Sequence, residues 1–417
     1  MRVLVDTTPL RVSRDFRRLW IGQAVSLFGT MVTSAALPFQ VFDLTGSSLA
    51  VGLLGAAQLG PLLACAVVGG SVADRVDKRR VLLVVTTASL VCSSILAVNA
   101  TLGHPQLWLL YVVGALASGV TAVSFAVLRS LLPLLLDQDL RPAGFALQST
   151  YTTFGWMAGP AVAGVLISAF GLTSAYSVDA ATFVVALGAF AGIAPAPPVS
   201  GAAGSATASL VGGLRFVRSH RIILSVFAID LLAMVFGMPR ALFPALSDRL
   251  GGGPLLYGLL LSSVAAGGFV ASLASGWTSR VRRQGRALLV AVAVWGVCIA
   301  AGGLTRAAVV VLVVFALAGG ADMVSAVFRS SIAANLTPDD MRGRVSGVEF
   351  AVYAGGPVLG DVESGVVGGL AGLPFAIVSG GIACVIAAGA FAMWVRGLAG
   401  YRTSVAAAAE APAVTAT

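Results

Sequence analysis

The sequence predicts an all-α integral membrane protein with twelve transmembrane helices in two six-helix halves. Three observations predict this fold class: the composition, a series of long apolar runs separated by short basic segments, and a repeat between the two halves of the chain. The 417 residues are 58% hydrophobic and 10% charged, with a mean hydropathy of +0.96. Soluble domains carry about 25% charged residues, so this composition excludes a soluble protein.

Twelve apolar runs are each long enough to cross a bilayer, because about 20 apolar residues span the hydrocarbon core. We expect the spans near residues 17–42, 50–73, 81–102, 106–130, 143–170, 174–194, 222–246, 255–278, 286–304, 308–334, 345–370 and 373–396. A six-helix bundle then covers 17–194 and a second covers 222–396. The flanking segments are a cytoplasmic N-terminus at 1–16, a cytoplasmic linker rich in Pro, Ala, Gly and Ser at 195–221, and an Ala-rich, disordered cytoplasmic tail at 397–417.

The distribution of Lys and Arg predicts the orientation, because cytoplasmic loops carry an excess of these residues. With the N-terminus in the cytoplasm, 23 of the 26 Lys and Arg residues fall in inside segments. Only Arg240, Arg249 and Arg306 fall outside. This asymmetry places both termini in the cytoplasm and requires an even number of spans. The net charge of +9 therefore reflects topology, and we expect no nucleic-acid partner.

An internal repeat relates the two halves. Residues of the first half recur 206 positions later: Pro38 as Pro244, Gly52 as Gly258, Gly70 as Gly276, and Leu82-Leu83-Val84 as Leu288-Leu289-Val290. Two more pairs follow at other offsets: Arg129-Ser130 with Arg329-Ser330, and Gly159-Pro160 with Gly356-Pro357. Parallel six-helix repeats are found in secondary transporters.

The charged turn between the second and third spans resembles a known signature. Residues 70–80 read Gly-Ser-Val-Ala-Asp-Arg-Val-Asp-Lys-Arg-Arg, which is similar to Gly-x-Leu-Ala-Asp-Arg-x-Gly-Arg-Arg of the major facilitator superfamily of secondary transporters. The residues of this signature loop are Gly70, Asp74, Arg75, Lys78, Arg79 and Arg80. Val72 and Asp77 depart from the pattern. The resemblance implies alternating access, in which two halves rock about a central site.

The resemblance also implies a role for Asp74. In this family the acid of the turn packs near the cytoplasmic start of helix 11, where the positive end of a helix favours an anion. Here that start carries Arg342 and Arg344. We therefore expect these two gate partners to bind Asp74 and hold the cytoplasmic side closed. The alternative is that Asp74 is a solvated loop charge.

The fifth span contains a glycine motif, Gly155-x-x-x-Gly159-Pro160-x-x-x-Gly164. Glycines four residues apart let another helix approach closely, and the proline permits a kink. Ordinary helix packing is one interpretation. The motif also resembles the antiporter motif of drug and proton antiporters, which implies export over import, although Ala163 stands at one of its glycine positions. The arginine of those antiporters is missing from the fourth span, so proton coupling cannot be assigned to it.

Three acids inside expected spans are candidates for proton coupling: Asp361, Asp322 and Asp230. Ionisable residues inside a membrane are costly and usually functional. Burial favours the neutral form of a carboxyl, so such a group can bind and release a proton near neutral pH. We expect Asp361, beside Gly360, to line the cavity.

Two other acids are weaker candidates, and a structural interpretation stays open for all five. Asp179 lies near the outer end of the sixth span, from which it can reach the interface. Glu363 points about 200° away from Asp361 on a helix, so the two cannot share one proton site. The structural alternative is that the acids form ion pairs with Arg129 or Arg329.

Polar side chains in the spans are candidates for lining a substrate cavity: Gln23, Gln58, Tyr151 and Tyr353, together with Gln40 and Gln148. No Walker-type Gly-Lys-Ser/Thr sequence is present, which argues against an ATP-driven pump. The four cysteines all fall in apolar runs and the two histidines in loops. The sequence thus contains no catalytic constellation, and we expect no enzyme activity, metal or cofactor.

Three fragments of the second half refine the resemblance: residues 239–248, the pair of segments 336–338 and 343–347, and Gly360-Asp361. They are most similar to enterobactin exporters and multidrug efflux proteins. We therefore expect a monomeric proton antiporter of the inner membrane that exports a siderophore or a lipophilic drug. Its partners are a small-molecule substrate, protons and the bilayer. An importer in the same fold and a non-transporting sensor or scaffold remain alternatives.

Overall fold

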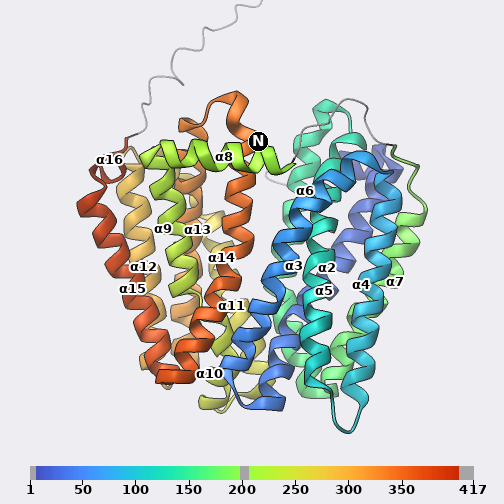
Figure 1. Cartoon of the computed structure of the whole chain (residues 1–417), viewed down its shortest axis with the longest axis horizontal. Coiled ribbons are helices and arrows are strands. Elements are labelled where there is room, and N and C mark those ends of the chain that lie inside the picture. Colours follow the sequence, from blue (N-terminus) through green and yellow to red (C-terminus); the bar gives the residue numbers. More distant parts are fainter. Residues whose placement is uncertain (1–5, 198–205, 403–417) are drawn as a thin grey trace, which may run out of the picture.

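The computed structural model describes residues 6–197 and 206–402, and all regular secondary structure within them is helical (Figure 1). The first group of long helices is α2 (Arg14–Thr45), α3 (Ser48–Arg75), α4 (Lys78–Thr101), α5 (Leu107–Leu131), α6 (Arg141–Phe170) and α7 (Leu172–Ala191). The second group is α9 (Arg221–Gly237), α11 (Gly253–Leu273), α12 (Gln284–Leu304), α13 (Ala308–Leu336), α14 (Arg342–Ala371) and α15 (Leu373–Trp394).

Shorter helices connect or flank these groups. They are α1 (Thr8–Val12), η1 (Leu132–Leu134), η2 (Gln138–Leu140), α8 (Ala206–Ser219), η3 (Arg240–Leu242), α10 (Phe243–Arg249), η4 (Ser275–Arg280), η5 (Asp339–Met341) and α16 (Arg396–Ala399). The expected linker therefore contains a helix, α8. Of the expected disordered tail at 397–417, residues 397–399 belong to α16 and Leu398 is buried, which corrects that part of the prediction, and residues 403–417 lie outside the described residues.

Eleven helical segments of the described chain are long and apolar enough to cross a membrane, and they coincide with eleven of the twelve expected spans. The other expected span is α14. Its 30 residues exceed the length that a bilayer requires. It carries Glu349, Asp361 and Glu363, which lower its mean hydropathy.

The expected continuous span at 222–246 is interrupted in the structure. Helix α9 ends at Gly237, and the chain then forms the short turn η3 before α10 begins at Phe243. Pro239 and Pro244 account for the interruption, because proline lacks the backbone N–H that an α-helix uses. Unwound backbone at membrane depth occurs where it is buried in protein or lines a cavity. The interruption brings Arg240 to a position that a continuous helix would not give it.

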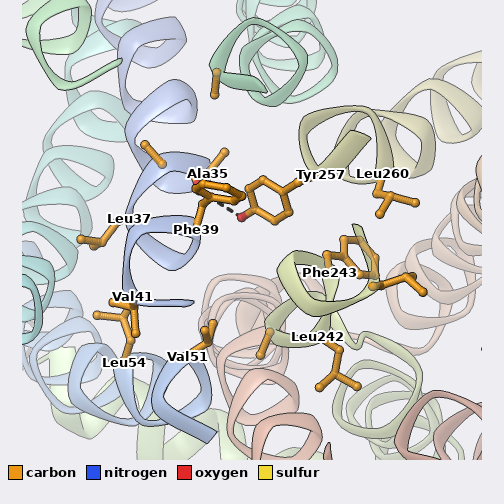
Figure 2. Packing of buried hydrophobic residues seen from close by; sticks show 14 of the residues in the cluster. Ala35, Leu37, Phe39, Val41, Val51, Leu54, Leu242, Phe243, Tyr257 and Leu260 are labelled. Atoms are coloured by element: carbon orange, nitrogen blue, oxygen red, sulfur yellow. Dashed lines mark hydrogen bonds between the residues drawn. The ribbon is translucent and has the colours of Figure 1, made fainter. Parts of the chain in front are cut away.

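The two groups of helices stand side by side (Figure 1). Buried apolar residues of both groups form one hydrophobic core at one end. We call this the closed end; it is formed by residues 35–54 of the first group and 241–260 of the second. Figure 2 shows Phe39 of α2 against Tyr257 of α11, with ring centroids 5.4 Å apart. The Tyr257 hydroxyl donates a 3.0 Å hydrogen bond to the Ala35 carbonyl across the groups. Burial of this apolar surface favours contact between the groups at the closed end.

At the opposite end the buried apolar residues form separate clusters. Phe227, Leu288 and Phe328 belong to a cluster within the second group. Leu82 and Phe190 belong to a cluster within the first. We call this the split end; α8 lies across it, near the N-terminus (Figure 1). The molecule is thus held together more extensively at one end than at the other.

Two helix contacts bring the groups together at the closed end, and both use glycines. A Cβ on Gly52 of α3 would lie 2.8 Å from the Asp361 carbonyl and 3.0 Å from the Gly365 Cα of α14. A Cβ on Gly164 of α6 would lie 2.7 Å from the Pro254 carbonyl of α11. Backbones this close exclude any side chain at these positions. Gly52 and Gly258 are also the matched positions of the internal repeat, and Gly258 meets Gly164 in the second contact.

Candidate functional site

The structure pairs two of the candidate acids with one arginine. Asp230 of α9 and Arg329 of α13 form a 2.5 Å ion pair, and their side chains are 9% and 11% exposed. Asp322, two turns earlier on α13, lies 3.8 Å from the same guanidinium, but its side chain is 44% exposed. One arginine therefore faces two carboxylates, of which Asp322 is held more loosely and has the more exposed side chain. The alternative that Arg329 pairs with an intramembrane acid is confirmed for Asp230.

Asp322 lies near α14, the helix that contacts α3 and α5 of the first group. Tyr353 of α14 is within electrostatic range of Asp322 and Arg329 and is 58% exposed. One turn away, Phe350 stacks on Phe125 of α5, with ring centroids 4.8 Å apart. This aromatic pair joins the two groups between the closed and split ends. Tyr353 and the charged residues near it therefore face the region between the groups.

Arg129 lies next to this aromatic pair. Its guanidinium carbon is 5.3 Å from the Phe125 ring centroid, within the range of a cation–π interaction. In the described part of the chain it forms no ion pair, so the alternative that Arg129 pairs with an intramembrane acid is wrong there. Sequence reasoning missed the roles of Phe125 and Phe350, because apolar side chains in a span carry no signal that separates them from the core.

Asp361 is in an ion pair, as in the structural alternative, but its partner is Arg240 and neither of the two arginines named there. The Arg240 guanidinium donates to the Asp361 carboxylate at 2.7 Å, and the two side chains are 26% and 19% exposed. Arg240 reaches α14 because the chain is unwound at η3. The Asp361 carbonyl lies against Gly52 of the first group. Asp361 is thus at the closed end. The sequence had predicted that it lines the cavity.

Asp179 does not reach an interface, so that interpretation is wrong. It is only 2% exposed, and Ser93 of α4 donates a 2.6 Å hydrogen bond to its carboxylate. The residue lies two turns into α7, with its side chain turned toward α2 and α4.

The described residues of the signature loop bind the segment that follows α7. Asp77 accepts hydrogen bonds from the backbone N–H groups of Arg79 at 2.8 Å and Ala196 at 3.4 Å. The Lys78 N–H donates to the Ala196 carbonyl, and the Arg79 guanidinium to the Ala191 carbonyl. Asp77, a departure from the family signature, is the N-cap of α4. Arg75 and Arg80 are exposed.

The proposed gate is tested only in part. The surroundings of Gly70 and the side chain of Asp74 lie outside what the structure describes, so the pairing of Asp74 stays a prediction. Arg342 pairs with Asp339 at 2.9 Å on the surface. Arg344 lies 3.6 Å from the Met341 sulfur and packs its backbone against Gly213 of α8.

We expect Asp77→Ala to lower the free energy of unfolding by about 1 kcal/mol, because it removes an N-cap. The measurement is the thermal midpoint of the purified protein in detergent. Asp137→Ala is the matched control, because Asp137 precedes η2 without a side-chain capping bond. Equal midpoints for the two variants would contradict the capping role.

The glycine motif of the fifth span serves two contacts. Gly155 and Gly159 face Leu27 and Met31 of α2 within the first group. Pro160 and Gly164 face α11 of the second group. The motif therefore lies where one helix contacts both groups.

The predicted cavity residues of the first group do not all line the same cavity. Gln23 and Tyr151 line one small cavity between α2, α5 and α6, beside Trp20 and Gln148. The Tyr151 ring packs edge-on against Trp20 at a centroid distance of 6.0 Å. Gln58 instead points at Gly114 of α5. Gln40 is buried and accepts a 2.7 Å hydrogen bond from the Tyr176 hydroxyl.

Comparison with known proteins decides the family. A family model described as transmembrane secretion effector matches residues 6–413. The chain belongs to this family.

Curated relatives of this transmembrane secretion effector are named enterobactin exporter EntS. Those of Shigella boydii and Escherichia coli are 24% identical over 369 residues, which cover 88% of each chain. This confirms the resemblance to the major facilitator superfamily and to the enterobactin exporter group. The chain is thus a multi-pass membrane transporter and not an enzyme.

Solved structures show the same fold. A bacterial homolog of the human lysosomal transporter Spinster, in an inward-facing and unoccupied conformation, has a TM-score of 0.71 at 15% identity, covering 94% of this chain and 98% of its own. Nucleoside transporter NupG has a TM-score of 0.72 at 14% identity, covering 92% and 97%.

Two arginines of the inside and outside counts lie well within expected spans and not in loops. Arg329 lies inside α13 and Arg240 in the unwound turn η3, and both pair with acids. Without Arg329 the inside count falls from 23 to 22, and without Arg240 the outside count falls from 3 to 2. The asymmetry that predicts the orientation is unaffected. The prolines at 239 and 244 are the feature of the sequence that could have predicted a break in the helix at Arg240.

Proposed function

We propose that the protein is a secondary active exporter of the inner membrane that moves a small molecule by alternating access and proton antiport. The substrate is a siderophore or a lipophilic drug or antibiotic. The observation that carries the proposal is the unequal joining of the two groups: one shared core at the closed end and separate cores at the split end. Curated relatives named as exporters support the direction of transport.

The fold supports a division into two six-helix halves, 17–194 and 222–396, with α14 as the twelfth span. Gly171 and Gly372 support this repeat: both have positive φ, 79° and 88°, at the tight turns between α6 and α7 and between α14 and α15. The charge asymmetry supports cytoplasmic termini, and the split end then faces the cytoplasm.

We assign substrate recognition to the aromatic residues between the groups. Phe125 and Phe350 offer ring surfaces, and Arg129 supplies a cation beside them. Stacked rings and a nearby cation suit an aromatic anion such as a catecholate siderophore. Tyr353 adds a phenol hydroxyl that can donate a hydrogen bond to the substrate.

Among the three candidate acids we assign proton release to Asp322. It is the most exposed of them and is held only loosely by Arg329, which already pairs with Asp230. After Asp322 releases its proton, the positive charge of Arg329 would stabilise the carboxylate. One proton moving through 100 mV supplies about 2.3 kcal/mol. This supports a concentration ratio of roughly fifty for a neutral substrate.

The test uses inverted membrane vesicles with an imposed pH gradient, acid inside. Candidate substrates are added, either an iron-free catecholate siderophore or lipophilic drugs, and proton release is followed with a pH-sensitive dye. We expect release with one substrate class, and its loss in Asp322→Asn. The same assay on Asp361→Asn and Asp230→Asn compares the other two acids.

Each outcome bears on a separate part of the proposal. Release that survives Asp322→Asn but is lost in Asp361→Asn or Asp230→Asn moves the proton site to that acid. Movement of substrate out of the vesicle lumen, which corresponds to movement from periplasm to cytoplasm in the cell, would favour an importer. Absence of proton release with every candidate would contradict the antiport mechanism.

A further inference from the structure

The transport mechanism proposed above does not use the buried carboxylate of Asp179 on α7. It is 2% exposed, and no ion pair of the described chain involves it. Ser93, itself 3% exposed, donates to Oδ2 at 2.6 Å. A buried charge without a cation is strongly unfavourable. Some positive charge is therefore needed to stabilise this carboxylate in its ionised form.

Hydroxyl oxygens from two other positions face the same carboxylate, Thr33 of α2 and Thr182 of α7. The Thr182 hydroxyl donates to the Asp179 backbone carbonyl at 2.6 Å, which leaves its lone pairs available. Asp179 Oδ1 and Thr33 Oγ1 are both buried, and neither has a hydrogen-bond partner among the described residues. A cation can contact both oxygens, whereas a proton on Oδ1 would be shared with one of the neighbouring hydroxyls, and the pH and Na⁺ dependence of stability separates these two cases.

Gly29 of α2 keeps this place free of a side chain. A Cβ there would lie 2.7 Å from Asp179 Oδ1 and would overlap the Thr182 hydroxyl. The other titratable group facing Asp179 is the thiol of Cys92 on α4, which is buried. Helices α2, α4 and α7 thus surround a group of oxygen atoms with one formal negative charge.

We propose that Asp179, with the hydroxyls of Ser93, Thr33 and Thr182, binds a Na⁺ ion between α2, α4 and α7. Hard cations take oxygen ligands, and a single carboxylate balances the charge of a monovalent ion. The site lies entirely in the first group, whereas Asp230, Asp322 and Arg329 lie in the second. It does not rest on the exporter proposal and can be tested without a transport substrate.

The experiment uses the purified full-length protein in detergent at fixed pH and ionic strength, with Na⁺ replaced by K⁺ or choline. A bound ion stabilises the folded state, so at about ten times its Kd we expect Na⁺ to raise the Tm by about 3 °C. Equilibrium binding of radioactive sodium should reach one ion per chain. Both responses are expected to be lost in Asp179→Asn.

Two further variants test whether the loss of Na⁺ binding in Asp179→Asn reflects only misfolding. Thr33→Val keeps the side-chain shape and is expected to weaken Na⁺ binding about tenfold, the equivalent of one ligand oxygen. Thr30→Val is the matched control, because the Thr30 hydroxyl bonds to the Ser26 carbonyl within α2. This control should bind Na⁺ as the wild type does.

Three results would overturn the proposal. They are equal Tm values in Na⁺ and choline, a Na⁺ response that survives in Asp179→Asn, or stabilisation by acid pH without any effect of Na⁺. The last would make Asp179 a proton site. Asp322→Asn should retain the Na⁺ response whatever its effect on transport, which separates this proposal from the exporter proposal.

Discussion

Replacing Arg329 with methionine is expected to destabilise the protein by roughly 3–5 kcal/mol, because it leaves the Asp230 carboxylate buried without its cation. Asp230 is 9% exposed and has Arg329 at 2.5 Å. The loss should appear as a fall in the thermal midpoint and in the yield of monodisperse protein in detergent. Arg342→Met is the matched control for stability, because Arg342 and Asp339 are 62% and 87% exposed. Exposed pairs contribute about 0–1 kcal/mol.

The double variant Arg329→Met with Asp230→Asn distinguishes a buried charge from lost packing. Removing both charges takes away the desolvation cost as well as the attraction, so most of the stability should return. Proton release in vesicles should still be altered, since Asp322 loses its nearby cation too. A double variant as unstable as Arg329→Met alone would show that the guanidinium acts through packing.

The second large effect is expected at the contact between α3 and α14. A side chain at Gly52 would collide with the Asp361 carbonyl and the Gly365 Cα, which are backbone atoms that cannot rotate away. Overpacking of this kind costs about 1–3 kcal/mol, so Gly52→Val should disfavour the closed end by about tenfold or more. Transport should fall with it, because the alternating access proposed above requires the closed end to form in every cycle.

Gly60→Val on the same helix is the matched control. No atom lies within 4 Å of a Cβ at Gly60, so this variant should transport normally. The state of the closed end can be followed by maleimide labelling of Ala241→Cys, which is 1% exposed, after the four native cysteines are replaced. Faster labelling in Gly52→Val than in Gly60→Val is expected. Equal labelling and equal transport would contradict the role given to Gly52.

The glycine contacts also give a structural reason for one matched pair of the internal repeat. Gly52 and Gly258 are matched positions, and each meets a helix of the other group at the closed end. Close backbone approach leaves no room for a side chain at these two places.

The sequence by itself determined the class of the protein, the position of eleven spans, the family and the set of intramembrane acids. These depend on local properties, because hydropathy and loop charge act over one helix at a time. It also limited the choice of partners, since Arg329 was one of two arginines considered for the acids.

Only the tertiary structure decided how those residues meet. Arg240 and Asp361 are 121 positions apart, and they pair because Pro239 and Pro244 interrupt a helix that hydropathy reads as continuous. Asp179 is buried rather than interfacial because Gly29 lets α2 approach α7, which depends on helix packing. The difference between the closed and split ends likewise arises from contacts between distant helices. A one-dimensional pattern records which residues are apolar or charged, but not which of them face each other.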